Sequence, residues 1–398
     1  MEALQKIVAI PIITIIELCL LMQLIQANES STVIVICPDG TVDPPTAPIL
    51  KIGATYVFTE EIHAGIVVQR SNMIIDGRNF AIKGNHLLNS TGILLSNVKG
   101  VTVKRVNVTG FFYAVKMEES ENCIMTENNI TNNDFGIWIE RSDSNIVSKN
   151  IFSNLWSAVT LKHASKNQIF ENKFSNNIYG IMLEWSFENT LTKNIFTEND
   201  NSVDLALSSR NFITENFVRG KSKGSWYGIR LHSSSNNTIR ENSIECTFYA
   251  LSLLYYTKGN LIISNNVSQN SYGIVIWYAI NNTIYHNRFI DNTEQAKCYS
   301  FQNKWDAGYP DGGNYWSNYV GTDEKSGSNQ DQLGSDGIGD IPYIIDDKNI
   351  DRYPIMGEFP KPKSNQYPIL HYAVAIAVST CLGIAAFAVY RTRKKPKA

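Results

Sequence analysis

The sequence lacks the surplus of basic residues that a nucleic-acid-binding surface needs. It holds 35 Lys and Arg against 37 Asp and Glu, which gives a formal net charge of −2. Proteins that bind DNA or RNA normally carry a basic excess or a basic patch, so we predict no nucleic-acid partner. Residues that favour helices are also comparatively scarce between positions 70 and 300, which argues against a helical domain there.

The sequence also lacks cysteines with the spacing of a metal or redox site. Of its 6 Cys, Cys19 and Cys381 lie in apolar segments near the two ends. The others are widely spaced and match neither a zinc pattern nor a CxxC motif. We expect buried free thiols, because unpaired Cys packs like a small hydrophobic residue, and disulfide bonds are the alternative. These four residues are Cys37, Cys123, Cys246 and Cys298.

Long apolar runs occur only at the two ends of the chain. Residues 7–24 are mostly apolar, with one charged residue at Glu17, and are followed by the small-residue stretch around Ala27. This arrangement is typical of a secretory signal peptide. We predict that residues 1–27 are this signal, with an uncleaved signal anchor as the alternative.

The C-terminal run predicts a membrane anchor. Residues 373–390 give 18 consecutive residues without a charge, enough to cross most of a bilayer core of ~30 Å. We predict a transmembrane helix at 372–390, preceded by a polar stalk at 361–371 and followed by a basic tail at 391–398. Because basic residues stay on the cytoplasmic side, the chain would be a single-pass cell-surface protein with an exterior N-terminal domain.

Exterior placement would make seven N-x-S/T sequences available for glycosylation. Asn-rich repeats also create such sequences by chance, so their occupancy stays open. They begin at Asn28, Asn89, Asn107, Asn129, Asn236, Asn266 and Asn281.

What the sequence has in abundance is a repeat of about 22 residues. Each repeat begins with an Asn and holds a second Asn five positions later, as in Asn145 and Asn150. An aliphatic residue stands two positions after the first Asn, and an alternating apolar pair follows, as in Val159 and Leu161. A small residue precedes each pair. The first Asn recurs at Asn145, Asn167, Asn189, Asn211, Asn237, Asn260 and Asn282.

This period predicts an all-β, right-handed parallel β-helix solenoid. The alternating pair is typical of a half-buried strand, and stacking coils about 4.8 Å apart would align identical residues into ladders. We expect Gly or Ala before the pair to let the backbone turn tightly. Leucine-rich repeats share the period, but they would show L-x-x-L-x-L and a helical side. We predict an N-terminal cap at 33–70, repeats at 71–300 and a C-terminal cap with an acidic segment at 301–360.

The flanking motifs resemble those of NosD-type right-handed β-helix proteins, which are abundant on archaeal cell surfaces. The resemblance covers about residues 33 to 356. Its motifs are the segments 38–48, 71–77, 313–319, 336–343 and 349–354. The resemblance implies surface, carbohydrate-binding or sugar-hydrolysing roles, and through the family's namesake a periplasmic copper-accessory role. The 6 His are scattered and no cluster of Met, His and Cys suited to copper is visible, so copper binding is not carried over.

Outward positions of the predicted strands offer a catalytic hypothesis. Glu184, Asp204, Arg230 and His232 fall on neighbouring repeats. Two carboxylates with a cationic helper could serve acid–base hydrolysis or elimination of a polysaccharide. The alternative is a solvated face with alternating charges, which we favour.

Outward aromatic residues offer a binding hypothesis. Exposed aromatic rings that the fold does not need for its stability mark a contact surface. Flat rings also stack on the apolar faces of sugars. Trp138, Trp185, Tyr255, Trp277 and Tyr278 are the predicted sugar-binding residues. A second series recurs in register and is interpreted as a structural ring ladder: Phe135, Tyr179, Tyr227, Tyr249 and Tyr272.

The acidic segment could hold calcium. Asp331, Asp336 and Asp340 supply hard oxygen ligands among glycines, as calcium loops require. The full EF-hand pattern is lacking, and an ordinary acidic turn is the favoured alternative. No cofactor is required, and calcium is the one that the sequence suggests. Taken together, we predict a non-catalytic surface protein that binds glycans or other surface proteins, with a polysaccharide hydrolase or lyase as the alternative.

Overall fold

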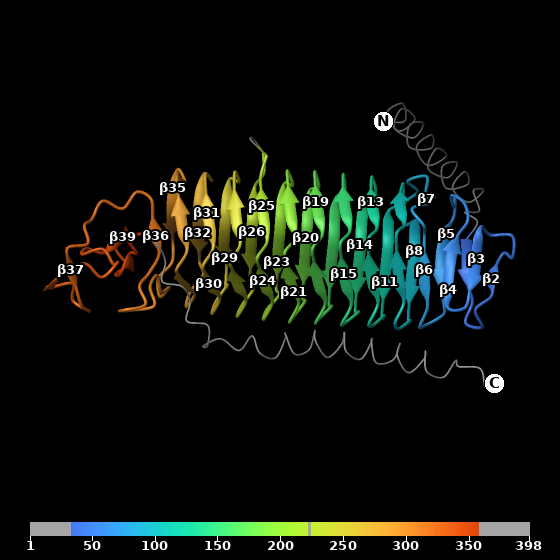
Figure 1. Ribbon diagram of the computed structural model, residues 1–398, viewed down its shortest axis with the longest axis horizontal. Coiled ribbons are helices and arrows are strands. Elements are labelled where there is room, and N and C mark those ends of the chain that lie inside the picture. Colours follow the sequence, from blue (N-terminus) through green and yellow to red (C-terminus); the bar gives the residue numbers. More distant parts are fainter. Residues whose placement is uncertain (1–32, 222–223, 358–398) are drawn as a thin grey trace, which may run out of the picture. The chain divides into compact units, whose positions relative to one another are not determined.

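The computed structural model describes residues 33–221 and 224–357. They form a right-handed parallel β-helix in which every coil contributes to three sheets, so the predicted fold is confirmed (Figure 1). These two ranges contain no helix, and accordingly none that could cross a membrane. The predicted segments 1–27, 361–371, 372–390 and 391–398 lie outside the described residues.

Sheet A is the 13-stranded sheet and has the longest strands, most of them six residues. Its strands, in chain order, are β1 (Val33–Ile36), β2 (Val42–Asp43), β5 (Gly65–Val68), β8 (Thr91–Ser96), β11 (Tyr113–Glu118), β14 (Phe135–Glu140), β17 (Ser157–Lys162), β20 (Tyr179–Glu184), β23 (Asn201–Ala206), β26 (Tyr227–His232), β29 (Tyr249–Leu254), β32 (Tyr272–Trp277) and β35 (Glu294–Cys298).

Sheet B is the 12-stranded sheet. Its strands are β3 (Ile49–Ile52), β4 (Thr55–Phe58), β6 (Ile74–Asp76), β9 (Thr102–Lys104), β12 (Ile124–Thr126), β15 (Ile146–Ser148), β18 (Gln168–Phe170), β21 (Thr190–Thr192), β24 (Phe212–Thr214), β27 (Thr238–Arg240), β30 (Leu261–Ile263) and β33 (Thr283–Tyr285).

Sheet C is the 11-stranded sheet. Its strands are β7 (Ala81–Lys83), β10 (Asn107–Thr109), β13 (Asn129–Thr131), β16 (Ile151–Ser153), β19 (Lys173–Ser175), β22 (Ile195–Thr197), β25 (Phe217–Arg219), β28 (Ser243–Glu245), β31 (Asn266–Ser268), β34 (Arg288–Ile290) and β36 (Tyr315–Trp316). Two small hairpins follow in the C-terminal cap: β37 (Lys325–Ser326) with β38 (Gln332–Leu333), and β39 (Tyr343–Asp346) with β40 (Asn349–Asp351).

The interior consists of in-register columns of apolar side chains, one residue from each coil. The predicted column of Val147, Ile169, Leu191, Ile213 and Ile239 is paired strand by strand in sheet B and fully buried, which confirms that prediction. Sheet C adds stacked rings that the repeat pattern did not predict. Phe152, Phe174 and Phe196 are buried with ring centroids 4.9 and 4.7 Å apart.

Buried asparagines link each coil to the next. The backbone N–H and the side-chain Nδ2 of Asn172 both donate to Oδ1 of Asn194, at 3.1 and 3.0 Å. Asn194 repeats the pattern toward Asn216. Both predicted Asn columns are hydrogen-bonded ladders of this kind, and a third interrupted column was not predicted. The third column contains Asn133, Asn177, Asn199, Asn270 and Asn292.

The Asn ladders also hold the turns between strands. The residue before each ladder Asn has a left-handed conformation, as in Ser144 with φ of 58° and Lys149 with φ of 56°. Such conformations cost on the order of 1–3 kcal/mol in strained cases and persist where neighbouring contacts determine them. The hydrogen bonds that the backbone N–H groups of Asn145 and Asn150 donate to the next coil supply those contacts.

The small residue before each apolar pair has a different role from the predicted one. Gly228 does not have a left-handed backbone conformation. The position therefore needs a small residue for lack of space and not for a tight turn. A Cβ at Gly228 would lie 2.6 Å from the carbonyl oxygen of Ala250 in the next coil. The register skips these small residues, because Tyr227 pairs with Tyr249 and Ile229 with Leu251. The strand therefore bends at the small residue.

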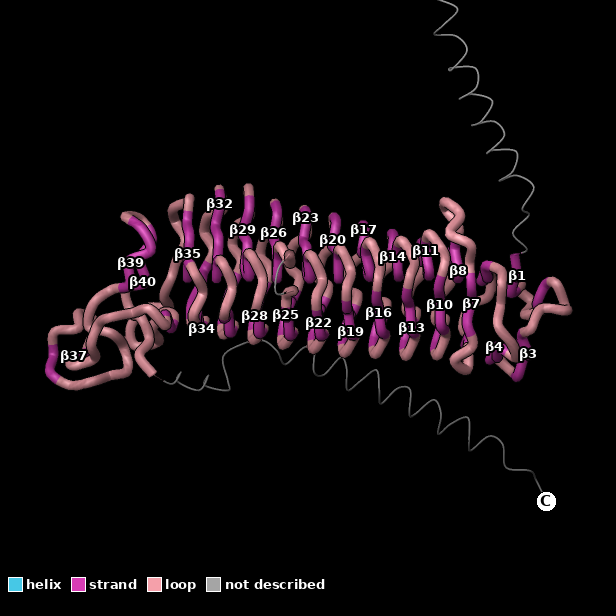
Figure 2. The backbone as a smooth tube through the Cα atoms, turned by 90° about the horizontal axis from the view of Figure 1, so that it is seen from above, coloured by secondary structure: helices cyan, strands magenta, loops and turns pink. Residues whose placement is uncertain are grey.

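Parallel pairing extends beyond the predicted repeat limits of 71 and 300. At the N-terminal end, β1 pairs in parallel with β5, while β2 and β3 close the sheet edges as antiparallel partners. At the other end, β36 pairs in parallel with β34. Figure 2 shows this continuous succession of coils, with β37, β39 and β40 beyond it. Covered edges matter because an open strand edge is a template for aggregation.

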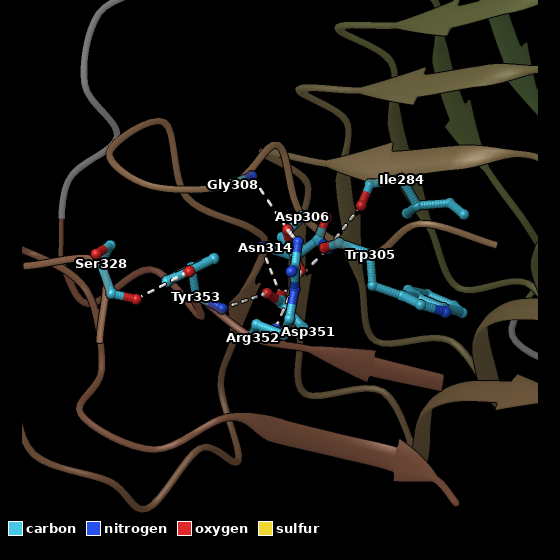
Figure 3. Close-up of polar contacts among 9 residues, drawn as sticks. All are labelled: Ile284, Trp305, Asp306, Gly308, Asn314, Ser328, Asp351, Arg352 and Tyr353. Atoms are coloured by element: carbon cyan, nitrogen blue, oxygen red, sulfur yellow. Dashed lines mark hydrogen bonds and ion pairs between the residues drawn. The ribbon is translucent and has the colours of Figure 1, made fainter. Parts of the chain in front are cut away.

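The C-terminal cap is closed by a buried polar network (Figure 3). Asp351 is fully buried and accepts hydrogen bonds from the Asn314 N–H at 2.7 Å and the Trp316 Nε1–H at 2.9 Å. Arg352 binds Asp306, with Nε 2.9 Å from Oδ2. Asn314 also donates to the carbonyl oxygens of Ile284 and Trp305. The motifs 313–319 and 349–354 thus meet as the two halves of one closure.

Candidate functional site

The outer face of sheet A carries three columns of outward side chains. Pairing from β11 to β35 keeps these columns in register. The second and third columns contain the residues predicted to face outward, such as Arg230 in the second column and His232 in the third. The first column was not predicted to face outward and holds Tyr113, Phe135, Ser157, Tyr179, Asn201, Tyr227, Tyr249, Tyr272 and Glu294.

The residues proposed for catalysis lie on three neighbouring strands but are engaged with other partners. Asp204 is buried and binds Arg230 through two contacts, one of them 2.9 Å between Nε and Oδ1. This carboxylate raises the pKa of the Arg230 guanidinium, against the opposing effect of burial. Glu184 lies at the surface, 3.7 Å from the Lys162 ammonium. His232 is exposed beside the Tyr255 ring, with centroids 5.5 Å apart. This arrangement does not present a free acid–base pair.

A cavity of about 250 Å³ lies further along the same face, over β26, β29, β32 and β35. We call it the aromatic trough. Its lining is mostly aromatic, with one cation and one hydroxyl-bearing small residue. The lining residues are Tyr227, Tyr249, Ser252, Leu254, Tyr255, Tyr272, Val275, Trp277, Lys297 and Tyr299.

Two ladders of rings belong to the trough. In the first, Tyr227, Tyr249 and Tyr272 stack at 5.4 and 5.2 Å between centroids. In the second, the Trp277 ring lies 6.4 Å from Tyr255 and 5.2 Å from Tyr299. Burial raises the pKa of the Tyr249 hydroxyl, so it stays protonated at neutral pH. The trough is therefore walled by ladders of aromatic rings, most of which carry a hydroxyl group.

Small side chains make the hollow between these rings. Ser252 and Val275 occupy the middle outward column on adjacent strands, between Arg230 and Lys297. Ser252 is 1% exposed. Its hydroxyl oxygen is buried and has no hydrogen-bond partner among the described residues. A buried polar group without a partner costs about 1–3 kcal/mol, so a ligand that supplies one would bind more favourably.

The predicted sugar-binding residues are only partly brought together. Tyr255 and Trp277 line the trough. Tyr278 flanks it, with its ring 6.1 Å from that of Tyr255. Trp138 lies instead in an N-terminal ring cluster, 5.1 Å from Phe135. Trp185 occupies a turn and stacks on His163 at 6.3 Å.

Sequence reasoning missed most of the trough for a specific physical reason. Strict alternation would place Tyr249 on the same side as the buried Leu251. The bend at Ala250 instead turns Tyr249 outward, and the same holds for Tyr227 and Tyr272. Their recurrence in register was visible, and the interpretation as a stacked ladder is correct, but the ladder also lines a cavity. No repeat signal singled out Ser252 or Lys297.

The acidic segment forms loops held by its own carboxylates. Asp336 accepts hydrogen bonds from the Gly327 and Ile338 N–H groups, and Asp340 accepts them from the Glu324 and Lys325 N–H groups. Asp331 is exposed. Residues 33–221 and 224–357 contain no group of three or more His, Cys, Asp or Glu residues that could hold a metal ion. Calcium binding by this segment stays a prediction.

The four cysteines within the described ranges are free thiols. Burial raises the pKa of Cys123, and it raises that of Cys298 to about 11. Thiols with raised pKa values are poor nucleophiles and metal ligands at neutral pH. Cysteine chemistry at these two positions is therefore not part of the site.

The chain is a parallel β-helix protein, and the outer face of its sheet A carries the aromatic trough. Residues 156–321 match the family described as periplasmic copper-binding protein (NosD), and residues 64–218 match the right-handed β-helix region family. The two matches support the resemblance to NosD-type parallel β-helix proteins that the motifs implied. No curated protein gives a significant match.

Solved structures share the fold at low identity. A double mutant of the periplasmic alginate epimerase AlgG is 14% identical, covering 68% of this chain and 72% of its own, with a TM-score of 0.52. PfbA, a surface adhesin of Streptococcus pneumoniae, is 15% identical, covering 59% and 82%, with a TM-score of 0.42. The Azotobacter vinelandii mannuronan C-5 epimerase AlgE6 A-module is 13% identical, covering 63% and 78%, with a TM-score of 0.43. At these identities the likeness concerns the fold alone.

Proposed function

We propose that this chain is an exported, membrane-anchored β-helix protein that binds a glycan in the aromatic trough without transforming it. The observation that carries the proposal is the buried, unpartnered hydroxyl of Ser252 between two ladders of rings. Sugars present apolar faces that stack on rings and hydroxyl groups that satisfy a buried serine. The ion pairing of Asp204 and Glu184 supports binding over catalysis.

Replacing Trp277 with alanine should weaken glycan binding about tenfold, because loss of one stacking surface is worth roughly 1–1.5 kcal/mol. Trp185→Ala is the matched control, since the two indoles are 43% and 44% exposed but only Trp277 lines the trough. The measurement is a glycan-array screen of the full chain, followed by titration of the best ligand. Equal losses in the two variants, or no glycan bound by the wild type, would contradict the trough as the site.

The membrane anchor and exterior location rest on sequence. The uncharged run at 373–390 and the basic tail at 391–398 support a C-terminal anchor with the β-helix outside. We expect the full chain to stay with membranes after alkaline washing and a variant without residues 373–398 to be released. Protease added to intact cells should cleave the β-helix domain. Release of the full chain by the wash, or protection from the protease, would contradict this topology.

A further inference from the structure

Lys297 is the charged residue among those that line the aromatic trough. It is half-buried on β35, and its ammonium lies 5.9 Å from the centre of the Tyr299 ring. Within the described parts of the chain, no carboxylate forms an ion pair with it. Glu294 is on the same strand but belongs to the first outward column and does not line the trough.

The other outward-facing Lys and Arg residues of sheet A all have acidic partners. Lys116 Nζ lies 2.7 Å from Glu118, Lys162 Nζ lies 3.7 Å from Glu184, and Arg230 binds Asp204. Outward Lys and Arg residues on this face thus form ion pairs, and Lys297 in the aromatic trough is the exception among the described residues. An unpaired ammonium beside apolar rings is a favourable contact for an anionic group of a ligand.

The two polar groups of the trough floor have a defined spacing. Ser252 and Lys297 occupy the same outward column and are separated by Val275. Two strand spacings correspond to roughly 10 Å. The ring ladders run in this same direction, across β26 to β35. A ligand that satisfies both groups must therefore extend along the stacking direction of the coils and carry an anion at one end.

We infer that the trough binds an acidic glycan chain that lies across β26 to β35, with a carboxylate or sulfate group at Lys297 and a sugar hydroxyl at Ser252. The inference rests on the proposed function, because it assigns the ligand class of the same trough. Rings supply stacking for any sugar, whereas Lys297 supplies the preference for negative charge. Because Lys297 is partly exposed, this preference should weaken as salt rises.

The test compares binding of the full chain to four probes of equal length. These are an alginate oligomer, an oligogalacturonate, the carboxyl-reduced form of that oligogalacturonate, and a sulfated dextran oligomer. We expect at least one acidic probe to bind about five- to tenfold more tightly than the neutral probe at low salt, a difference of roughly 1–1.4 kcal/mol. Comparison of the uronates with the sulfated probe distinguishes the two anion types.

Substitution of Lys297 separates the charge contribution from the stacking contribution. Lys297→Gln should bring the ratio of acidic-probe to neutral-probe affinity down to about one, and Lys297→Arg should retain the preference. Lys162→Gln is the matched control, because Lys162 lies on the same face but outside the trough. A wild type that binds acidic and neutral probes equally, or a Lys297→Gln variant that keeps the preference, overturns the acidic assignment and leaves glycan binding standing. Failure of all four probes to bind overturns the acidic assignment as well. If Trp277→Ala also has no effect on any glycan, the proposed function is overturned with it.

Discussion

Replacing Asn194 with alanine is expected to lower the free energy of unfolding by about 2–6 kcal/mol. Asn194 Oδ1 accepts from the backbone N–H and the Nδ2 of Asn172, and its own Nδ2 donates to the carbonyl oxygen of Ile169 at 2.8 Å. The substitution removes the acceptor of the buried Asn172 backbone N–H and the donor to the Ile169 carbonyl oxygen, two losses of about 1–3 kcal/mol each. Asn172 Nδ2 keeps its bonds to the carbonyl oxygens of Val147 and Phe170. The turn that precedes Asn172 also loses the contact that holds Glu171 in its left-handed conformation.

Asn129→Ala is the matched control, because Asn129 is a half-buried, outward residue of β13 that lies outside the buried ladders. We expect its effect to stay within about 0.5 kcal/mol. Urea unfolding followed by far-ultraviolet circular dichroism measures both variants. Similar unfolding midpoints for the two would mean that the ladders do not stabilise the coils.

The stability of the C-terminal cap is expected to fall as pH rises from about 4 to about 7. Burial raises the pKa of Asp351 to about 7 from an ordinary value of 3.8, although hydrogen bonds from Asn314 and Trp316 oppose the shift. Between these two pKa values the folded state holds a proton that the unfolded state has released. Raising the pH therefore favours unfolding in this window, by up to about 4 kcal/mol for a shift of roughly three pH units.

The measurement is the difference between wild type and Asp351→Asn in urea midpoint from pH 4 to pH 8. Asparagine keeps an oxygen that can accept from the Trp316 indole but cannot titrate in this range. Subtracting the variant's profile removes the contribution of the other titratable groups. We expect the wild type to lose stability relative to the variant up to about pH 7 and to level off above it. Parallel profiles would show that Asp351 does not bind a proton on folding in this window.

The coils could be predicted from sequence because every coil repeats the same local requirements. The interval between Asn145 and Asn167 gives the length of one coil, and the alternation of Val159 with Leu161 gives a strand. Stacking then follows, because identical residues at a fixed interval can satisfy one another only by lying in register. The confirmed burial of Val147 and Ile169 depends on nothing more than this period.

The caps were harder to predict because they do not repeat. The motifs containing Asn314 and Asp351 were visible as signatures, but nothing in their spacing showed that they contact each other. Their pairing depends on a chain that leaves β36, forms two hairpins and returns. The spacing of the Asp residues in the acidic segment also did not show that Asp336 and Asp340 accept hydrogen bonds from backbone N–H groups elsewhere in the cap.

The sequence by itself determined the solenoid, its register, the buried Asn ladders and two of the trough residues, Tyr255 and Trp277. Only the tertiary structure decided where a site could form. Tyr249 faces outward because the strand bends at Ala250, whose side chain is fully buried together with that of Leu251. The surface is hollowed at Ser252 because larger side chains surround this residue on neighbouring coils. A period fixes what each coil shares, whereas a binding site arises from the positions at which neighbouring coils differ.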